Sequence, residues 1–156
     1  MRLQLITVGK RPPQWVQDGV KDYQRRLPPE LATTLIEIEP AKQRNGLTGE
    51  RRMAEEYARI EKAITPRATI IALDQSGETF SSERLSKQLA RWLQSGRNCA
   101  FIIGGADGLG RECVRSADHI WSLSDLTFPH ALVRVIVLEQ IYRAWTILKN
   151  HPYHRA

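Results

Sequence analysis

The stretch AFIIGGADGLGRE, residues 100–112, passes from an apolar run directly into a loop with four glycines. The apolar run, residues 99–103, shows no alternation, which predicts a strand buried on both faces, as in parallel sheets. Glycines after such a strand are typical of a backbone that turns with positive φ or passes very close to a neighbouring group. The stretch therefore predicts an α/β fold with a mostly parallel sheet and a special loop at the end of one strand.

The glycine spacing matches neither of the two common phosphate-binding motifs. The dinucleotide motif G-x-G-x-x-G can start only at Gly108, and Cys113 then takes the place of the third glycine. The P-loop spacing from Gly105 places Arg111 and Glu112 where a lysine and a hydroxyl residue are required. A small dinucleotide-dependent enzyme is therefore disfavoured. The loop is either a site read through backbone groups or a strand-to-helix turn without a ligand.

The sequence on both sides of this stretch alternates between strand and helix patterns. Continuous or alternating apolar residues predict strands at 3–8, 34–39, 68–74, 99–103 and, more weakly, 119–124. Helical spacing, caps and prolines predict helices at 13–27, about 53–64, 81–96 and 129–149. The alternation favours helices flanking a mostly parallel sheet.

Three of the connecting loops follow strands whose ends meet at one edge of such a sheet. These are LDQSGE at 73–78, GGADGLG at 104–110 and LSDLTFPH at 123–130. Ligands of open α/β sheets bind at the carboxyl ends of the strands. We therefore expect the three loops to lie together.

The composition is that of a folded protein with an excess of basic residues. A chain of 156 residues with 42% hydrophobic residues suits one domain, 1–156. Lys and Arg number 23 against 17 Asp and Glu, a net charge of +6 that favours an anionic partner such as nucleic acid. Residues 41–52, which we call the basic segment, carry four of these cations. They are either RNA phosphate contacts or an ordinary solvated surface.

Other classes of protein are disfavoured. Apolar runs are broken by charge before they reach membrane-spanning length, and the N-terminus lacks a signal-peptide pattern, so a cytoplasmic protein without membrane contact is expected. The two cysteines, Cys99 and Cys113, are too few for a disulfide framework and fit no zinc spacing. We expect both to be buried small residues and expect no metal.

Three longer motifs carry a resemblance to a known family. They are IIGGADGLG at 102–110, WSLSDLTFPHALVRVIVLEQIYRAW at 121–145 and NHPYHR at 150–155. With them the chain resembles the ribosomal RNA large subunit methyltransferase H family, small members of the SPOUT superfamily of knotted methyltransferases. The resemblance extends over essentially the whole chain, and the ending from residue 142 onward is its most specific part.

The resemblance implies a fold, a cofactor and a substrate. The fold is a single α/β domain whose C-terminal part makes a deep trefoil knot, an exception to the rule against threaded chains. The knot loops of the family bind S-adenosylmethionine in a bent form, largely through backbone groups. The substrate implied is a pseudouridine in the helix 69 loop of 23S rRNA on the ribosome, methylated at N3. Cofactor contacts are implied at Leu73, Gly104, Gly105, Leu123, Ser124, Asp125, Leu126, Thr127 and Phe128.

The C-terminal segment, residues 150–156, offers groups for the chemistry. Composition alone predicts a frayed terminus. An aromatic ring, an imidazole and a guanidinium can, however, stack on a flipped base, move a proton and pair with an oxyanion. With the resemblance, we expect Tyr153 and His154 at the base and Arg155 on a phosphate or a carbonyl group.

The predicted last helix has charged residues inside an apolar run. Glu139 either forms a salt bridge with Arg143, four residues on, or orients the tail or the substrate, and we count it among the catalytic candidates. Arg134 is expected to reach RNA or a partner subunit, and His130 to be structural. Apolar residues occupy more than one face of this helix, more than a small sheet can cover. This predicts a homodimer interface, and the resemblance implies that each site is completed by the partner's tail.

Two functions from different classes stay open on the sequence. The first is a methyltransferase that uses S-adenosylmethionine to modify ribosomal RNA. The second is a non-enzymatic RNA- or ribosome-binding factor that uses the same basic surface, with the glycines in a mere turn. Binding of the cofactor separates the two, because a pure RNA binder has no use for it.

Overall fold

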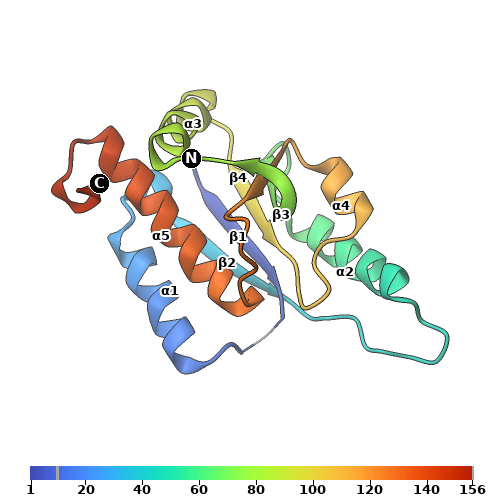
Figure 1. Cartoon of the computed structure of the whole chain (residues 1–156). Helices are drawn as coiled ribbons and strands as arrows, with labels where there is room; N and C mark the ends of the chain where they lie inside the picture. The colour runs from blue at the N-terminus through green and yellow to red at the C-terminus, as the bar shows by residue number, and fades with distance from the viewer. Residues whose placement is uncertain (10, 156) are drawn as a thin grey trace.

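A five-stranded parallel sheet forms the centre of the structure, a computed structural model that describes residues 1–9 and 11–155. The order across the sheet is β2-β1-β4-β3-β5, and every neighbouring pair runs parallel (Figure 1). This confirms the predicted α/β fold. The strands are β1 (Leu3–Val8), β2 (Thr33–Ile38), β3 (Thr69–Thr79), β4 (Cys99–Ile103) and β5 (His119–Ser122).

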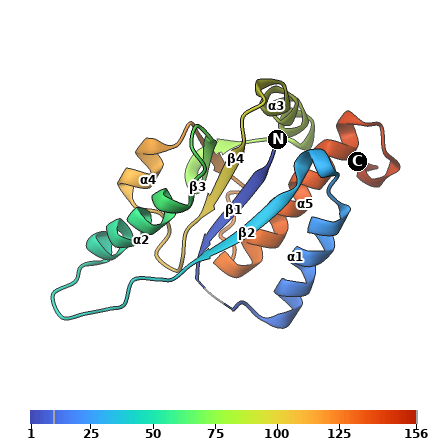
Figure 2. The same cartoon turned by 180° about the vertical axis from the view of Figure 1, so that it is seen from behind.

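Helices cover both faces of the sheet, as Figures 1 and 2 show from opposite sides. One layer contains α1 (Gln14–Arg26), α3 (Ser82–Ser95) and α5 (His130–Leu148), and α5 packs against both of the others. The other layer contains α2 (Gly49–Ala63) and α4 (Arg111–Ser116). The short helix α4 was not predicted, because six residues are too few to show a helical period. Two short turns, η1 (Pro29–Leu31) and η2 (Pro152–His154), complete the described chain.

The two central strands are buried at every position. On β1, Leu3 and Leu5 pack into the apolar cluster beneath α1, α3 and α5, whereas Ile6 and Val8 pack into the cluster on the side of α2. A strand with helices on both faces is buried at every position, which explains the continuous apolar run of β4. On β1 the buried side chain of Gln4 is satisfied by donating to the carbonyl of Ala63 at 2.8 Å. Cys99 and Cys113 are fully buried as expected, and burial raises the pKa of each thiol to about 12. Neither thiol is therefore a nucleophile at neutral pH.

Strand β3 is longer than predicted and bends around β5. Residues 74–78, expected as a loop, belong to the strand, so that part of the prediction was wrong. Trp121 pairs with Leu73 and again, after a shift in register, with Glu78. Gly77 permits this close path, because a Cβ there would lie 2.5 Å from the carbonyl oxygen of Ile120. The C-terminal trefoil knot stays a prediction.

Arg134 on α5 lies differently from its sequence prediction, and Trp15 on α1 is exposed. Arg134 was expected to reach RNA or a partner subunit, and this was wrong: it is 2% exposed and its Nη1 donates to Glu37 Oε2 at 3.2 Å. The reason is that α5 is packed between two helices and the sheet. The face of α5 that carries Arg134 is directed toward the sheet, where the guanidinium binds the carboxylate of Glu37 near the end of β2. Trp15 fits the helical period of α1 but is 62% exposed, while Val16 and Val20 are buried in its place.

Candidate functional site

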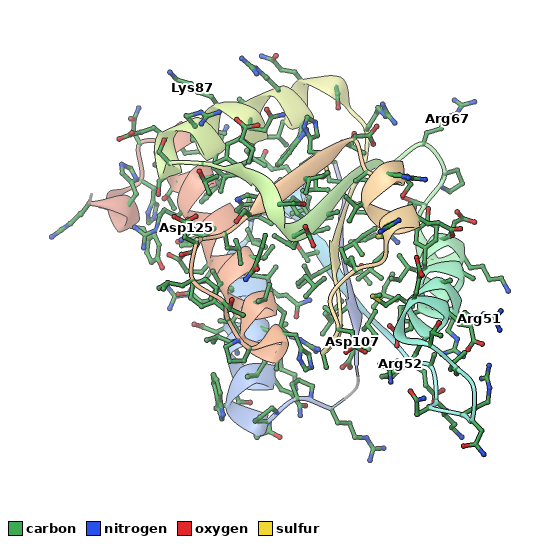
Figure 3. All side chains as sticks on the ribbon, turned by 45° about the vertical axis from the view of Figure 1, so that its right-hand side comes forward. Arg51, Arg52, Arg67, Lys87, Asp107 and Asp125 are labelled. Atoms are coloured by element: carbon green, nitrogen blue, oxygen red, sulfur yellow. The ribbon has the colours of Figure 1, made fainter. Side chains whose placement is uncertain are left out.

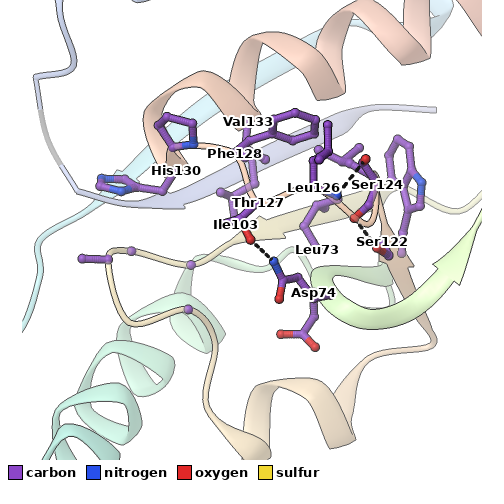
Figure 4. A pocket seen from close by; sticks show the side chains of 18 of the residues that line it. Leu73, Asp74, Ile103, Ser122, Ser124, Leu126, Thr127, Phe128, His130 and Val133 are labelled. Atoms are coloured by element: carbon purple, nitrogen blue, oxygen red, sulfur yellow. Dashed lines mark hydrogen bonds between the residues drawn. The ribbon is translucent and has the colours of Figure 1, made fainter.

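A pocket of about 620 Å³ opens at the carboxyl ends of β4 and β5 and beside the middle of β3, at residues 73–75 (Figure 4). These parts lie side by side because Leu73 pairs with Ile103 on one side and with Trp121 on the other. The three sequence segments expected to lie together all contribute to its wall, and the first turn of α5 closes it with His130 and Val133.

Eight of the nine residues implied as cofactor contacts line this pocket: Leu73, Gly104, Gly105, Leu123, Ser124, Leu126, Thr127 and Phe128. Asp125 is absent from the lining, and it is exposed (Figure 3). Asp74, Asp107 and His130 also border the pocket. The two carboxylates were not predicted as site residues, and His130 was expected to be structural. The sequence signal that could have identified them is their position, at or just after the end of a predicted strand or at the start of a predicted helix.

The glycines of residues 104–110, the glycine loop, are required by the loop's own geometry. A Cβ on Gly104 would lie 2.5 Å from the carbonyl carbon of Gly108, a distance that no real Cβ tolerates. Gly108 N donates to Gly105 O at 3.0 Å, and Gly108 has a φ of +76°, which favours glycine. The loop is therefore a tight turn that presents its backbone to the pocket.

The segment after β5 is held by its own polar side chains. Ser122 Oγ donates to the carbonyl of Ser124 at 3.2 Å, and Ser124 Oγ accepts from the backbone N–H of Leu126 at 3.0 Å. Gln75 Nε2 donates to Thr127 Oγ1 at 2.5 Å, which joins the bent part of β3 to this segment (Figure 4). The side-chain hydroxyls are thus used to shape the loop, so that backbone groups and apolar side chains face a ligand.

The basic segment is partly neutralised within the chain. Arg44 forms a bidentate pair with Glu55, with Nη2 2.5 Å from Oε1, and Arg52 pairs with Asp107. Lys42 and Arg51 are exposed and form no ion pair within the described residues. Figure 3 shows Arg51 directed away from the body of the protein. Two of the four cations are therefore available to a phosphate backbone.

The tail candidates lie at the other end of α5. The helix has 19 residues, so at 1.5 Å per residue its ends are about 28 Å apart. The pocket meets its first turn, whereas the turn η2 folds back along its C-terminal half, as far as Glu139 (Figure 1). The structure therefore does not bring Tyr153, His154 or Arg155 to the pocket of the same chain.

Glu139 lies in a polar cluster with the tail, away from the pocket. Its Oε1 is 2.7 Å from Arg143 Nη2, the salt bridge considered from the sequence, and Gln140 Nε2 donates to its Oε2 at 2.6 Å. The hydroxyl of Tyr153 also donates to Oε1, at 3.1 Å. Glu139 therefore has two of the roles considered from the sequence: it forms the salt bridge with Arg143, and the same carboxylate orients the tail through Tyr153.

Tyr153 is the residue that anchors the tail. Its ring packs edge-on against Tyr142, with centroids 4.7 Å apart, and its hydroxyl lies 3.2 Å from that of Tyr23 on α1. Burial, followed by the bond with Tyr23 and the charge of Glu139, raises its pKa well above the usual range. The phenol is therefore a hydrogen-bond donor at neutral pH. Within the described residues, Nδ1 of His154 is buried without a partner.

Replacing Tyr153 with Phe removes the hydroxyl and leaves the ring packing in place. We expect the free energy of unfolding to fall by about 1 kcal/mol, because the bonds to Glu139 and Tyr23 are lost. Thermal denaturation measures this as a drop in melting temperature of about 3 °C. Tyr142→Phe is the matched control, since within the described residues its hydroxyl makes no hydrogen bond. Equal melting temperatures for both variants would contradict the anchoring role.

Neither a membrane span nor a metal cluster is found in the described part of the chain. None of its helices combines the length and the apolar character needed to cross a bilayer. Nowhere in residues 1–9 and 11–155 do three or more His, Cys, Asp or Glu side chains gather in a way that would hold a metal ion.

Comparison with known proteins identifies relatives over the full length. The family described as "Predicted SPOUT methyltransferase" matches residues 1–154. A ribosomal RNA large subunit methyltransferase H from Methylococcus capsulatus is 50% identical over 155 residues, covering 99% of this chain and 100% of the relative. The protein of the same name from Saccharophagus degradans is 49% identical with the same coverage.

A solved structure shares the fold at low sequence identity. A "probable methylase family protein" from Haemophilus influenzae Rd KW20 superposes with a TM-score of 0.60 at 9% identity, over 95% of this chain and 68% of that one. Its likeness supports the architecture, and the family match and the full-length relatives carry the assignment. The chain belongs to the SPOUT methyltransferases and, within them, to the ribosomal RNA large subunit methyltransferase H family.

Proposed function

We propose that this protein transfers a methyl group from S-adenosylmethionine to N3 of a pseudouridine in the helix 69 loop of 23S rRNA, on ribosomes in the cytoplasm. The observation that carries the proposal is the convergence of eight expected contact residues, from three separate segments, around one pocket. The names of the full-length relatives, which specify the large-subunit ribosomal RNA, support the substrate class.

The pocket fits an adenosyl group with its amino-acid arm. Its volume of about 620 Å³ lies in the range of small-molecule sites, and its wall combines apolar side chains with backbone N–H and C=O groups. Leu73, Ile103 and Phe128 provide apolar surface for a purine. The backbone around Gly104 and along residues 123–128 would read the polar edges. When bound, the cofactor would supply a methyl group on a sulfonium, from which the sulfur leaves as a neutral thioether.

The protein's own residues must make N3 of the base reactive. An imide N–H is a poor nucleophile, so a group of the protein has to take its proton while N3 is held in line with the methyl group. We assign the proton to His154, because the Tyr153 phenol is a donor already held by Glu139. Arg155, which is exposed, would balance negative charge on a flanking carbonyl of the base or on a phosphate.

We further propose that the protein works as a homodimer in which the tail of one subunit completes the pocket of the other. None of the described tail residues, 150–155, lines the pocket of its own subunit. Trp15 and Leu126, the exposed large hydrophobic residues of the described chain, are 62% and 69% exposed, on α1 and beside the pocket. An interface between subunits would cover such residues.

The proposed activity is tested by incubating the protein with methyl-labelled S-adenosylmethionine and ribosomes that lack the modification. Nuclease fragments of the 23S rRNA then locate the label, which we expect on one pseudouridine in helix 69. Label on another nucleotide would support the methyltransferase activity and refute the pseudouridine in helix 69 as its target. No label together with no cofactor binding would favour the RNA-binding factor.

A further inference from the structure

An ion pair joins the basic segment to the glycine loop. Arg52, in the first turns of α2, pairs through Nη2 with Oδ2 of Asp107, and its Nη1 donates to Gln43 Oε1 at 2.7 Å. Asp107 belongs to the wall of the proposed cofactor pocket. Figure 3 shows the two labelled side chains side by side between α2 and the glycine loop.

Helix α2 also supports the other end of the same loop. A Cβ on Gly110 would lie 3.2 Å from Cβ of Met53, so the loop backbone rests closely on the helix. Between loop and helix lies a smaller cavity of about 200 Å³, lined by Arg52 together with residues 105–107 and His130. The glycine loop thus separates this cavity from the larger pocket, and α2 contacts it at two points.

A loop rich in glycine gains most from such support. Glycine loses more backbone freedom on ordering than other residues do, so a ligand that needs the loop ordered binds more weakly when the loop is free. The Arg52 side chain is 25% exposed, and both of its terminal nitrogens have partners within the chain. Its position therefore suits a structural bond better than a phosphate contact.

We propose that Arg52 is a positioning residue for the cofactor: through Asp107 it holds the glycine loop in the shape that lines the pocket. The inference rests on the proposed function, since it concerns the same pocket. It separates the basic segment into two roles. Arg52 supports the cofactor site, whereas the exposed Arg51 is free to meet RNA.

Calorimetric binding of two ligands tests this role. We expect Arg52→Gln to lower the affinity for S-adenosylmethionine and for S-adenosylhomocysteine by the same factor. The factor is about fivefold, which is the upper end of the range for a partly exposed ion pair. Two ligands are needed because only the first carries the sulfonium charge. Removing a nearby cation would by itself strengthen its binding and leave that of the thioether unchanged. Arg51→Gln, one residue away and exposed, is the matched control and should bind both ligands as the wild type does.

A charge swap distinguishes loss of the ion pair from misfolding of the Arg52→Gln variant. In the double variant Arg52→Asp with Asp107→Arg the pair is re-formed in reverse, and we expect at least half of the lost affinity for both ligands to return, with the wild-type melting temperature. Arg52→Gln binding equal to the wild type, or a change in one ligand only, would refute the positioning role while leaving the proposed function intact. A wild-type protein that binds neither ligand would refute the proposed function, and the inference with it.

Discussion

A protein that lacks residues 153–156 is expected to bind S-adenosylmethionine with unchanged affinity and to methylate ribosomes at less than a thousandth of the wild-type rate. The pocket contains none of the described residues 153–155 of its own subunit, and the partner's tail is proposed to act on the base, so cofactor affinity should not change. The deletion removes the proposed proton acceptor, whose general-base contribution alone is about 10²–10⁴-fold, and the guanidinium beside it. Calorimetry for the cofactor and single-turnover label transfer to ribosomes measure the two quantities on the same sample.

A point variant tests the proposed proton acceptor within the tail, and a second variant serves as its control. His154→Asn keeps the tail and its Tyr153 anchor, and we expect it to lose most of the rate. Lys149→Ala, an exposed residue at the end of α5 with no ion pair within the described chain, is the control and should keep it. A truncated protein that methylates at a tenth of the wild-type rate or better would show that the tail is not part of the catalytic site.

Replacing Gly104 with Ala is expected to abolish detectable cofactor binding while the domain stays folded. The new Cβ would lie 2.5 Å from the carbonyl carbon of Gly108 and 2.7 Å from its oxygen, so the glycine loop must open or shift. Backbone atoms cannot move aside as a flexible side chain would. We expect the affinity to fall by about a hundredfold or more, since the loop forms one wall of the pocket. Calorimetry measures the affinity, and far-ultraviolet circular dichroism checks the fold.

The control is Gly49→Ala, at the first residue of α2, where a Cβ would meet only the end of the Arg52 side chain at 4.0 Å. Its cofactor affinity should equal that of the wild type. If Gly104→Ala binds the cofactor normally, the glycine loop does not shape the site.

The two inactive proteins together test whether the site spans two subunits. One lacks only the pocket and the other lacks only the tail, so a mixed dimer has one intact pocket facing one intact tail. Random exchange of subunits would restore about a quarter of the wild-type activity. No recovery after subunit exchange would show that pocket and tail act within one chain.

The layers of this fold could be predicted because its signals are local. Strands buried on both faces have continuous apolar sequences. Helix α3 lies within the predicted range 81–96, between its N-cap Ser81 and its C-cap Gly96, which has a φ of +69°. The bend in β3 could not be predicted, since it depends on β5 passing beneath Gly77 some 40 residues earlier in the chain. Turn-forming residues such as Ser76 and Gly77 look the same in a loop and in a bent strand.

The site was predictable in its members and not in its geometry. The resemblance named eight residues that the fold brings to one pocket, although single residues such as Leu73 carry no chemical signal. The distance between pocket and tail depends on how η2 folds back on α5, and no sequence period reports it. The Arg52–Asp107 pair joins residues 55 positions apart, so the basic segment alone gave no means to tell a paired cation from a free one.

The separation of pocket and tail has a kinetic consequence. A subunit whose tail does not reach its own pocket is inactive by itself if the tail works in trans. The total methylation rate would then rise with the square of the protein concentration while the protein is dilute, and linearly once all subunits are dimeric. Turnover per subunit would rise in proportion to concentration and then become constant. In the dilute range, doubling the number of copies in a cell would about quadruple the total rate.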